Sequence, residues 1–385
     1  MKVLYLSPWY PHRYDAMSGL FVRKHAEAVA RGCEVCVLYL YADDKAKGYE
    51  VVEQVTDGVR EVYVYYPFID KPILRQLTKA IRFVIAFLKG YSFVEKSFGR
   101  PDVTQANVLT RCGALALWLK VRYGIPYVIV EHWTRYLPQN FNFKGFLRKL
   151  VSRMVVRRAS CVLPVSRMLG EAMRGCGLEN ANYKVVNNVV DDFFFDTHAD
   201  VSAHDGVFNF LHISCFIERA KNVCGILRVV KRLSEKRNDF RLTVIGVGPD
   251  FEKVRRYADE LELPDGKVVF VGEQPPSEVN RFFAVSDAFV LFSNYENAPV
   301  VISESLATGM PVISTDVGGI PDMIDATNGR LVKSGEEEAL YKSMSWMIDH
   351  RSEFDSELIR RNARRYSYGE VGGFLLSVYR EALAK

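Results

Sequence analysis

The amino-acid sequence predicts an α/β protein of two domains, each built on a doubly wound parallel sheet. Apolar runs of strand length alternate with runs of helical periodicity along almost all of the 385 residues. A polar stretch, DTHADVSAHDG at 196–206, divides this alternation into two halves. Parallel strands need crossover helices, so the alternation in each half indicates a Rossmann-like domain.

The first half is expected to contain short apolar strands, with glycine stop signals at Gly32 and Gly124 after two of the helices. We predict strands at 3–6, 34–40, 62–66, 106–110, 126–132 and 161–165. We predict helices at 19–30, 73–90, 113–123, 144–158 and 167–174.

The second half repeats the alternation and ends in an amphipathic run. We predict strands at 208–214, 242–246, 268–272, 288–292, 311–315 and 329–332, with helical runs between them. Helices are expected at 221–236, 249–262 and 371–384. The expected domains are therefore 1–195 and 205–367.

The composition is that of a soluble globular protein, with 49% hydrophobic and 25% charged residues. No uncharged apolar run reaches about 18 residues, so a spanning helix is not expected. The N-terminal run MKVLYLSP is too short for a signal peptide and is read as a first strand. Seven cysteines, an odd number, fit reduced thiols. Together these features predict a cytoplasmic protein.

Basic residues are concentrated in the first half of the chain. Residues 71–174 contain 19 Lys and Arg against 4 Asp and Glu, while the whole chain carries a net charge of +5. The segments 71–90 and 144–158 mix basic and large apolar residues at near-helical spacing, which favours contact with an anionic membrane surface. A solvated basic face or attraction of a phosphorylated acceptor would give the same pattern. No nucleic-acid-binding motif is present, so no nucleic-acid partner is expected.

The most informative segment is 289–324, in which Glu296 and Glu304 stand eight positions apart around Pro299. Pro299 suits the first turn of a helix. The amides around Ala298–Val301 would then point at an anion such as a diphosphate. The two carboxylates could accept hydrogen bonds from sugar hydroxyls. The alternative is that both are helix-start carboxylates favoured by the macrodipole.

This segment closely resembles the Glu-x7-Glu signature of the family 4 retaining glycosyltransferases, which have the GT-B fold. The resemblance extends over nearly the whole chain. It implies two domains facing a central cleft, with the C-terminal helix 368–385 crossing back to the first domain. The segments that carry it are SPWYPHRYDAMSGLFVRKHAEAVA, YVIVEHWT, VVNNVVDDFFF, VIGVGPDFEKV, VFVGEQPPSEVNRFFAVSDAFVLFS and ATGMPVISTDVGGIPDMI.

The resemblance also implies roles for individual residues. Glu304 would bind the donor ribose, Glu296 the transferred sugar and Lys221 the diphosphate, while His132 would lie by the donor sugar. A glycine such as Gly19 lets the backbone approach the phosphates. The expected catalytic residues are His132, Glu296 and Lys221. The expected donor-binding residues are Gly19, Arg219, Lys221, Gly246, Gly248, Glu296, Ala298, Pro299, Val300 and Glu304.

Three positions depart from the family pattern. Cys215 stands about where the family commonly has an arginine. Either Arg219 supplies that charge or the phosphate is held by one cation fewer. Asn297 stands where a glycine is common, and its side chain could restrict which donor sugars bind. Gly19 stands alone where a glycine pair is common.

No Asp-x-Asp motif occurs in the chain, so we expect metal-independent transfer without a cofactor and with retention at the anomeric carbon. The expected reaction moves a hexose-type sugar from a UDP- or GDP-linked donor to a glycan or lipid-linked saccharide, in bacterial surface polysaccharide or glycoconjugate synthesis. The expected location is the cytoplasm or the inner face of the cytoplasmic membrane. Three alternatives stay open: a catalytically silent nucleotide-sugar-binding or scaffold protein, a sugar-nucleotide epimerase, and an inverting transferase.

Overall fold

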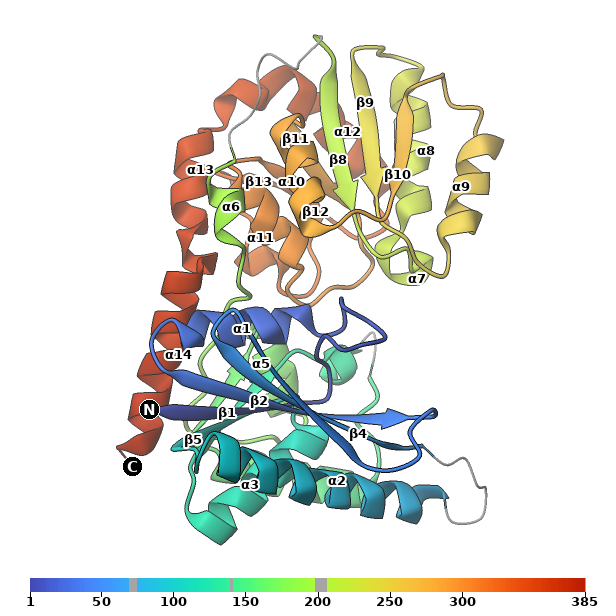
Figure 1. The fold of residues 1–385 in the computed structure, drawn as a ribbon. Coiled ribbons are helices and arrows are strands. Elements are labelled where there is room, and N and C mark those ends of the chain that lie inside the picture. Colours follow the sequence, from blue (N-terminus) through green and yellow to red (C-terminus); the bar gives the residue numbers. More distant parts are fainter. Residues whose placement is uncertain (69–74, 139–140, 198–205, 385) are drawn as a thin grey trace. The chain divides into compact units, whose positions relative to one another are not determined.

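The computed structural model describes residues 1–68, 75–138, 141–197 and 206–384 (Figure 1). The chain forms two compact units. Unit 1 comprises Met1–Val189 with Tyr368–Lys385, and unit 2 comprises Val190–Ser367.

Within the described residues, unit 1 contains a seven-stranded sheet in the order β3-β4-β2-β1-β5-β6-β7. All neighbouring strands are parallel except β3 and β4. The strands are β1 (Lys2–Ser7), β2 (Glu34–Asp43), β3 (Glu50–Thr56), β4 (Val59–Pro67), β5 (Val103–Asn107), β6 (Tyr127–Glu131) and β7 (Cys161–Pro164).

The β3–β4 hairpin is not among the predicted elements. Its two-residue turn is Asp57-Gly58, with positive φ at both residues (50° and 79°), as a tight hairpin turn requires. The edge strand β3 is mostly exposed and carries charges at Glu50 and Glu53, so it lacks the apolar run used to predict strands. The Asp-Gly pair was the signal that could have revealed it.

Helices cover both faces of this sheet. Figure 1 shows α1 over one face and α2 and α3 over the other. The elements are α1 (Leu20–Ala30), α2 (Arg75–Ser97), α3 (Thr110–Tyr123), η1 (Thr134–Tyr136), α4 (Phe146–Arg158), α5 (Arg167–Gly175) and α14 (Tyr368–Leu383).

The C-terminal helix α14 packs inside unit 1. A Cβ added at Gly372 would lie 2.4 Å from the Ala28 carbonyl oxygen, so only glycine allows α14 to approach α1 this closely. The Tyr379 hydroxyl lies 2.8 Å from that of Tyr5 and donates to Gln105 Oε1 at 2.5 Å. Buried polar residues such as Gln105 explain why β5 starts three residues before the predicted strand at 106–110.

Within its described residues, unit 2 contains a six-stranded parallel sheet in the order β10-β9-β8-β11-β12-β13. The first strand of the unit, β8, therefore lies between β9 and β11. The direction of the crossovers reverses at this point, where open α/β sheets bind their ligands. The strands are β8 (Phe208–Ile213), β9 (Phe240–Ile245), β10 (Val268–Gly272), β11 (Ala288–Leu291), β12 (Val312–Thr315) and β13 (Gly329–Val332).

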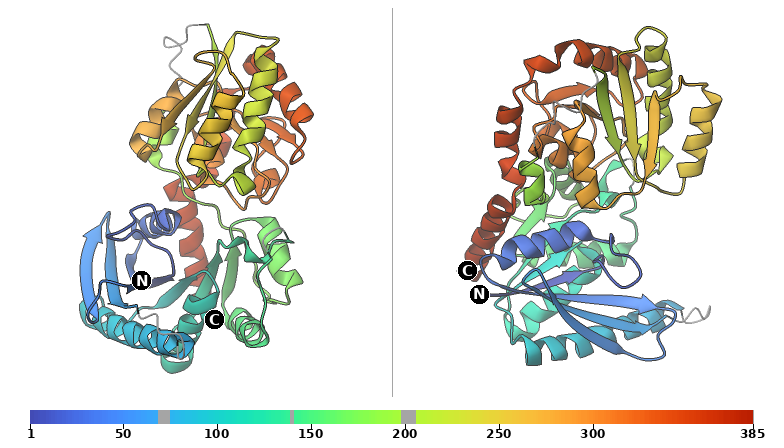
Figure 2. Two further views of the ribbon diagram at one scale, coloured as in Figure 1. Left: turned by 90° about the vertical axis from the view of Figure 1, so that its right-hand side faces the viewer. Right: turned by 45° about the horizontal axis from the view of Figure 1, so that its top comes forward.

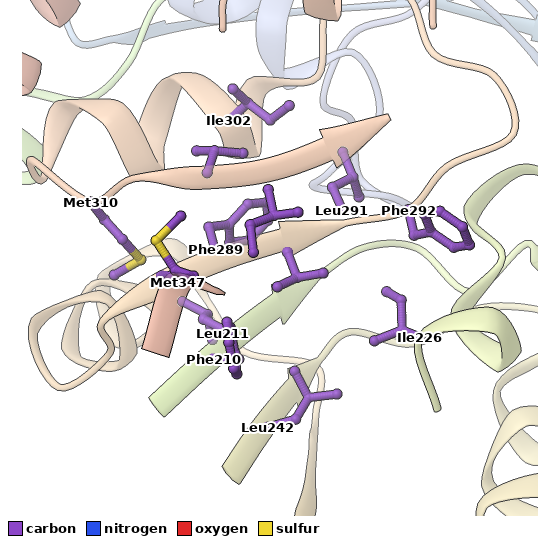
Figure 3. Close-up of a cluster of buried hydrophobic side chains, with 14 of the residues drawn as sticks. Phe210, Leu211, Ile226, Leu242, Phe289, Leu291, Phe292, Ile302, Met310 and Met347 are labelled. Carbon is purple, nitrogen blue, oxygen red and sulfur yellow. The ribbon is translucent and has the colours of Figure 1, made fainter. Parts of the chain in front are cut away.

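Helices flank the sheet of unit 2 (Figure 2), and the buried core of the unit lies between the sheet and these helices. Phe210, Leu242 and Phe289 from three strands are buried together with Ile302 and Met347 from helices (Figure 3). The helices are α6 (Asp192–Phe195), α7 (Glu218–Lys221), α8 (Val223–Ser234), α9 (Phe251–Glu260), α10 (Pro276–Ala284), α11 (Val300–Ala307), η4 (Ile320–Asp322), α12 (Glu337–His350), η5 (Arg351–Glu353), α13 (Ser356–Ala363) and η6 (Arg364–Tyr366). The predicted fold class, two doubly wound parallel-sheet domains, is confirmed.

The connection between the units differs from the expected boundaries of 1–195 and 205–367. Unit 2 begins at Val190, and Phe194 and Phe195 are buried in its core. The ring of Phe194 meets that of Phe283 edge-on, with 5.5 Å between centroids. Residues 198–205 of the predicted linker lie outside the described residues.

Candidate functional site

Two predicted site residues meet at the carboxyl edge of the unit 2 sheet. Lys221 ends α7, which follows β8, and Glu296 lies in the loop after β11. The Lys221 Nζ lies 2.5 Å from Glu296 Oε1, with 17% and 10% of the two side chains exposed. This ion pair therefore lies at the point of the sheet where the strand order reverses.

The loop that carries Glu296 is tied to α7 by further hydrogen bonds. The Ser293 hydroxyl donates to Glu296 Oε1 at 2.8 Å. The amide of Asn294 donates to the carbonyl of Ala220 at 2.7 Å, and its side chain donates to the carbonyl of Arg219 at 3.0 Å. These contacts fix the carboxylate beside the lysine.

The glycine pair after β12 supports the same loop from the other side. Gly318 has a φ of 62°, and a Cβ there would lie 2.0 Å from the Glu296 carbonyl oxygen. The Gly319 amide donates to the Asn297 carbonyl at 2.6 Å. Neither glycine was among the predicted site residues, although a Gly-Gly pair in a loop after a strand indicates a close backbone approach.

His212, which was not among the predicted site residues, supports this site through two hydrogen bonds of its ring. It is fully buried on β8, with Nδ1 2.8 Å from the Val290 carbonyl and Nε2 2.8 Å from the Ser214 hydroxyl. Burial lowers the pKa of His212 to about 4, and the nearby Lys221 charge acts in the same direction. The neutral ring therefore donates from Nδ1 to the carbonyl and accepts from Ser214 at Nε2.

Gly246 and Gly248 bring two loops of unit 2 together. A Cβ at Gly246, whose φ is 126°, would lie 2.0 Å from the Ser214 carbonyl oxygen. A Cβ at Gly248 would lie 2.5 Å from the Phe216 amide nitrogen. The loop after β9 thus packs backbone to backbone on the loop after β8. The predicted contact of these glycines with a nucleotide stays a prediction.

Helix α11 begins at Val300, and Pro299 occupies its N-cap position. No side chain in the described part of the chain caps this helix, so the amides of its first turn remain candidates for the predicted anion contact. Pro299 itself has no N–H and can only shape the turn. Glu304 lies one turn inside α11 and is half-buried. Its contact with a ribose, and the place of Ala298 beside a diphosphate, stay predictions.

The end of α7 presents one further cation. Arg219 is exposed, and no carboxylate in the described part of the chain forms an ion pair with it. Cys215 is also exposed, in the loop after β8. Glu218 accepts from the amides of Val223 and Cys224 at 2.8 and 3.0 Å, which caps α8 and fixes the turn that presents Lys221.

In unit 1, Gly19 stands at the N-cap of α1 with a φ of 63°. A Cβ there would lie 2.4 Å from the carbonyl carbon of Trp9. The preceding loop is closed by Asp15, which accepts from the amides of Met17 and Ser18 at 2.9 and 3.1 Å. Gly19 is therefore required by the fold of its own loop.

His132, directly after β6, belongs to an aromatic cluster that includes this loop. Its ring centroid lies 4.3 Å from that of Phe21 and 5.6 Å from that of His25. Trp9 contacts Trp133 at 5.2 Å and Phe21 at 6.4 Å. Burial lowers the pKa of His132 well below its usual range, and His25 adds to this shift. The ring is therefore neutral at physiological pH.

Glu131, the residue before His132, is a fully buried carboxyl group that the sequence did not mark. It accepts from the backbone amides of Leu109 at 2.9 Å, His132 at 3.1 Å and Trp133 at 2.9 Å. Burial raises the pKa of Glu131 to about 7, although these hydrogen bonds oppose the shift. Its role is to hold the backbone that orients the His132 ring.

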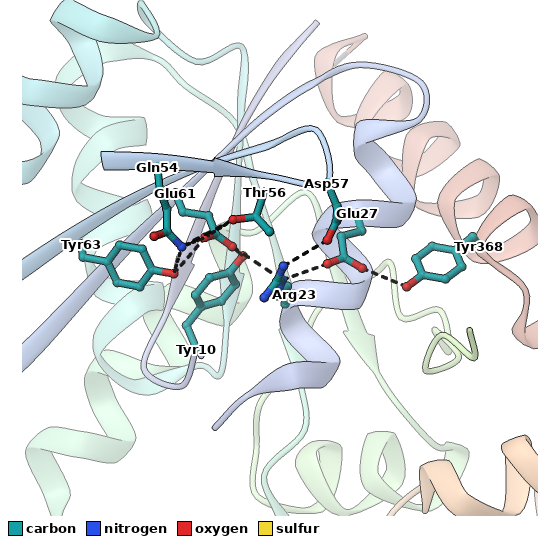
Figure 4. Close-up of polar contacts among 9 residues, drawn as sticks. All are labelled: Tyr10, Arg23, Glu27, Gln54, Thr56, Asp57, Glu61, Tyr63 and Tyr368. Atoms are coloured by element: carbon teal, nitrogen blue, oxygen red, sulfur yellow. Dashed lines mark hydrogen bonds and ion pairs between the residues drawn. The ribbon is translucent and has the colours of Figure 1, made fainter. Parts of the chain in front are cut away.

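Helix α1 is held by a polar network inside unit 1 (Figure 4). Buried Glu61 accepts from the Tyr10 hydroxyl at 2.6 Å, while Arg23 pairs with Glu27 at 2.9 Å. The Tyr368 hydroxyl of α14 donates to Glu27 at 2.9 Å. The start of α1, and with it Gly19, is thereby fixed against the β3–β4 hairpin and the C-terminal helix.

Family models match both halves of the chain. Residues 22–192 match the model described as Glycosyltransferase Family 4. Residues 196–365 match the model described as Glycosyl transferases group 1. Together the two models extend over most of the chain.

Individual proteins with similar sequences or structures agree with these matches. A colanic acid biosynthesis glycosyltransferase, WcaL of Salmonella typhimurium, is 27% identical over 51% of this chain and 50% of its own length. An N-acetyl-alpha-D-glucosaminyl L-malate synthase of Bacillus anthracis is 27% identical over 48% of this chain and 49% of its own. The chain thus matches about half the length of these relatives.

Among solved structures, Anabaena HepE in complex with UDP has a TM-score of 0.75 at 16% identity, and the match covers 99% of this chain and 100% of HepE. This likeness shows that the chain has the GT-B fold. With both halves matched by the corresponding family models, the chain belongs to the family 4-type glycosyltransferases.

Proposed function

We propose that the protein is a retaining, metal-independent glycosyltransferase. It would move a hexose-type sugar from a nucleotide diphosphate sugar to a glycan or lipid-linked acceptor in bacterial surface polysaccharide or glycoconjugate synthesis. The observation that carries this proposal is the Lys221–Glu296 pair, held with Ser293 at the switch point of the unit 2 sheet.

In the proposed mechanism, Lys221 turns from Glu296 to the donor diphosphate. Its ammonium group has three N–H donors, and the amides of the first turn of α11 add further donors. Negative charge grows on the leaving phosphate as the bond from the anomeric carbon to the phosphate oxygen breaks. Donors already in place stabilise this charge, which is the largest electrostatic contribution to catalysis expected here.

The carboxylates bind hydroxyls in this proposal. Glu296 accepts from the transferred sugar and Glu304 from the ribose. The acceptor hydroxyl forms the new bond on the face that the phosphate leaves, and its proton passes to the leaving phosphate oxygen. From unit 1, Gly19 would meet the phosphates through its backbone, and neutral His132 would contact a sugar hydroxyl.

The decisive test is the loss of transfer in Lys221→Ala and Glu304→Ala. Each is expected to lower transfer by at least about a hundredfold, as loss of a preorganised donor typically does. Lys231→Ala on α8 is the control, because its ammonium group donates to the Glu262 carbonyl and to no other group in the described part of the chain. Near-normal transfer by either variant, with an unchanged melting temperature, would overturn the assignment.

The donor is best identified by a thermal-shift screen. UDP-sugars are the first choice because the structurally similar HepE has been crystallised with UDP, and GDP-sugars are the second. A ligand at about 100 times its Kd adds about 2.7 kcal/mol to the free energy of unfolding, which such a screen detects.

Three measurements separate the proposal from its alternatives. An NMR assignment of the product's anomeric configuration distinguishes retaining from inverting transfer. Release of an isomerised nucleotide sugar without an acceptor would indicate an epimerase. Donor binding without turnover across an acceptor panel would indicate a silent binding or scaffold protein, an alternative that exposed Cys215 in place of a family arginine keeps open. Full activity in excess EDTA is expected if no metal takes part.

For the location, we propose the cytoplasm with contact to an anionic membrane surface through segments 71–90 and 144–158. No helix in the described part of the chain is long and apolar enough to cross a bilayer. Residues 71–74 of the first segment lie outside the described residues. In the described remainder, α2 exposes Ile81, Val84 and Leu88 at helical spacing. Flotation with anionic vesicles tests this contact.

A further inference from the structure

Helix α4 carries a stripe of large apolar side chains on its exposed side. Phe146 and Leu147 are 84% and 71% exposed, and Leu150 and Met154 follow one and two turns later. Residues four positions apart share one helix face, so these side chains form a continuous stripe. Such a stripe on one helix marks a surface that another apolar phase covers.

The charges on the same helix are all positive. Arg148, Lys149, Arg153, Arg157 and Arg158 lie on α4, which has no acidic residue. No carboxylate among the described residues forms an ion pair with any of these five side chains. An apolar stripe edged by unpaired cations complements an anionic lipid surface, because the stripe enters the acyl boundary while the cations meet the head groups.

Two hollows lined by basic residues lie at the carboxyl end of α4, next to the apolar stripe. A smaller hollow is lined by Leu150, Arg153, Met154, Arg157 and Arg158. The last two arginines also line a hollow of about 790 Å³. This larger hollow is lined further by Arg100, Lys120, Asn180 and Asn182.

The negative groups around the larger hollow already have partners. Lys120 Nζ donates to the Arg158 carbonyl at 2.8 Å, and Asn180 donates to the carbonyls of Val156 and Ala159 at 2.6 and 2.9 Å. These donors satisfy the carbonyl groups at the negative end of the helix. Asp102, which also lines the hollow, accepts from the Lys2 amide at 2.7 Å. The guanidinium groups of Arg157 and Arg158 are left for an external anion.

We propose that this larger hollow binds the phosphate head group of an anionic phospholipid, with the acyl chains lying along Leu150 and Met154. The site is distinct from the edge that carries His132: residues 124–126, which line the hollow, precede β6, whereas His132 follows it. The proposal rests on the membrane contact proposed above for residues 144–158 and does not depend on the transferase activity. The 13 residues of α4, about 20 Å long, would lie along the membrane surface.

The test uses flotation of the full-length protein with phosphatidylcholine vesicles, with and without phosphatidylglycerol. Binding is expected only with phosphatidylglycerol and is expected to weaken as salt is raised. The double variant Arg157→Gln/Arg158→Gln is expected to bind about 10- to 30-fold more weakly, from about 1 kcal/mol for each charge near the surface. Arg255→Gln/Arg256→Gln, an exposed arginine pair on α9 in unit 2, is the matched control and should bind like the wild type.

Three results would overturn the proposal. The first is equal binding to both kinds of vesicle. The second is normal binding by the Arg157→Gln/Arg158→Gln variant when Phe146→Ser/Leu147→Ser has lost it, since the hollow would then play no part. The third is a thermal shift with inorganic phosphate or glycerol phosphate that depends on Arg157 and Arg158 without any vesicle binding, which would assign the hollow to a soluble anion.

Discussion

The two units build their candidate site residues in different ways. Unit 2 holds an ion pair, Lys221 with Glu296, on loops whose backbones touch where glycine leaves room for them. Unit 1 holds a neutral ring, His132, in a cluster of aromatic side chains. Loops in backbone contact must move apart when a methyl group is added between them, whereas packed side chains can adjust by small shifts.

The largest effect is expected at the connection between the units. Phe194→Ala removes a fully buried ring that meets Phe283, and it should lower the stability of unit 2 by about 3–5 kcal/mol. Hydrogen exchange followed by mass spectrometry should show faster exchange in β8 and β11, with β1 and β5 unchanged. Faster exchange in unit 1 alone would place residues 190–195 with the first domain, as the sequence suggested.

The next largest effect is expected from a single methyl group in unit 2. Gly318→Ala would place a Cβ 2.0 Å from the Glu296 carbonyl oxygen at a φ of 62°, so the loop must move. We expect a loss of about 2–4 kcal/mol together with at least tenfold lower transfer. Urea unfolding and a transfer assay measure the two effects.

Gly335→Ala is the matched control for this change. Its φ is 78° and no atom of the described residues lies within 4 Å of the added Cβ, so Gly335→Ala carries the backbone strain of a positive φ without the clash. It should cost about 1–2 kcal/mol and leave transfer unchanged. Equal effects of the two substitutions would show that strain, rather than support of the Glu296 loop, explains the result.

Lowering the pH should reduce the free energy of unfolding of both units, because each unit contains a buried histidine. Burial lowers the pKa of His25 in unit 1 and of His212 in unit 2 to about 4, while in the unfolded chain a histidine takes up a proton near pH 6.5. The unfolded state then binds more protons, so stability falls as the pH drops below about 6.5. Each ring should cost about 2 kcal/mol at pH 5.

Glu131, which lies in unit 1, changes the free energy of unfolding with pH in the opposite direction. Because burial raises its pKa to about 7, the folded state keeps a proton that the unfolded state releases near pH 4.5, so stability falls as the pH rises between these values. Glu131→Gln should therefore steepen the acid loss in unit 1 and leave unit 2 unchanged. Hydrogen exchange of α1 and β8 between pH 7 and 5 measures this, and equal slopes in both proteins would contradict it.

The smallest effect is expected at Arg219. The side chain is exposed on α7, so Arg219→Ala should leave the melting temperature unchanged and raise the donor KM by about 3- to 10-fold if it replaces the charge missing at Cys215. Arg281→Ala, an exposed arginine on α10, is the control. An unchanged KM would mean that Lys221 is the cation that suffices for the phosphate.

Sequence analysis correctly predicted the alternation of strands and helices, the two-domain fold class and the start of α11 near Pro299. These follow from periodicity and turn chemistry, which are local properties of the chain. It failed where local signals were weak: at the exposed edge strand β3, and at β5, where Gln105 is polar yet buried. Burial of such a residue depends on a partner as distant as Tyr379.

Which residues contact one another became known from the folded structure. Lys221 and Glu296 are 75 positions apart, and their pairing depends on β8 lying beside β11. The supporting residues His212, Gly318 and Glu131 were missed because each contacts a backbone group that is distant in the sequence. A single histidine, glycine or glutamate in a sequence is compatible with many roles. Its close-packed neighbours in the folded protein show which role it has.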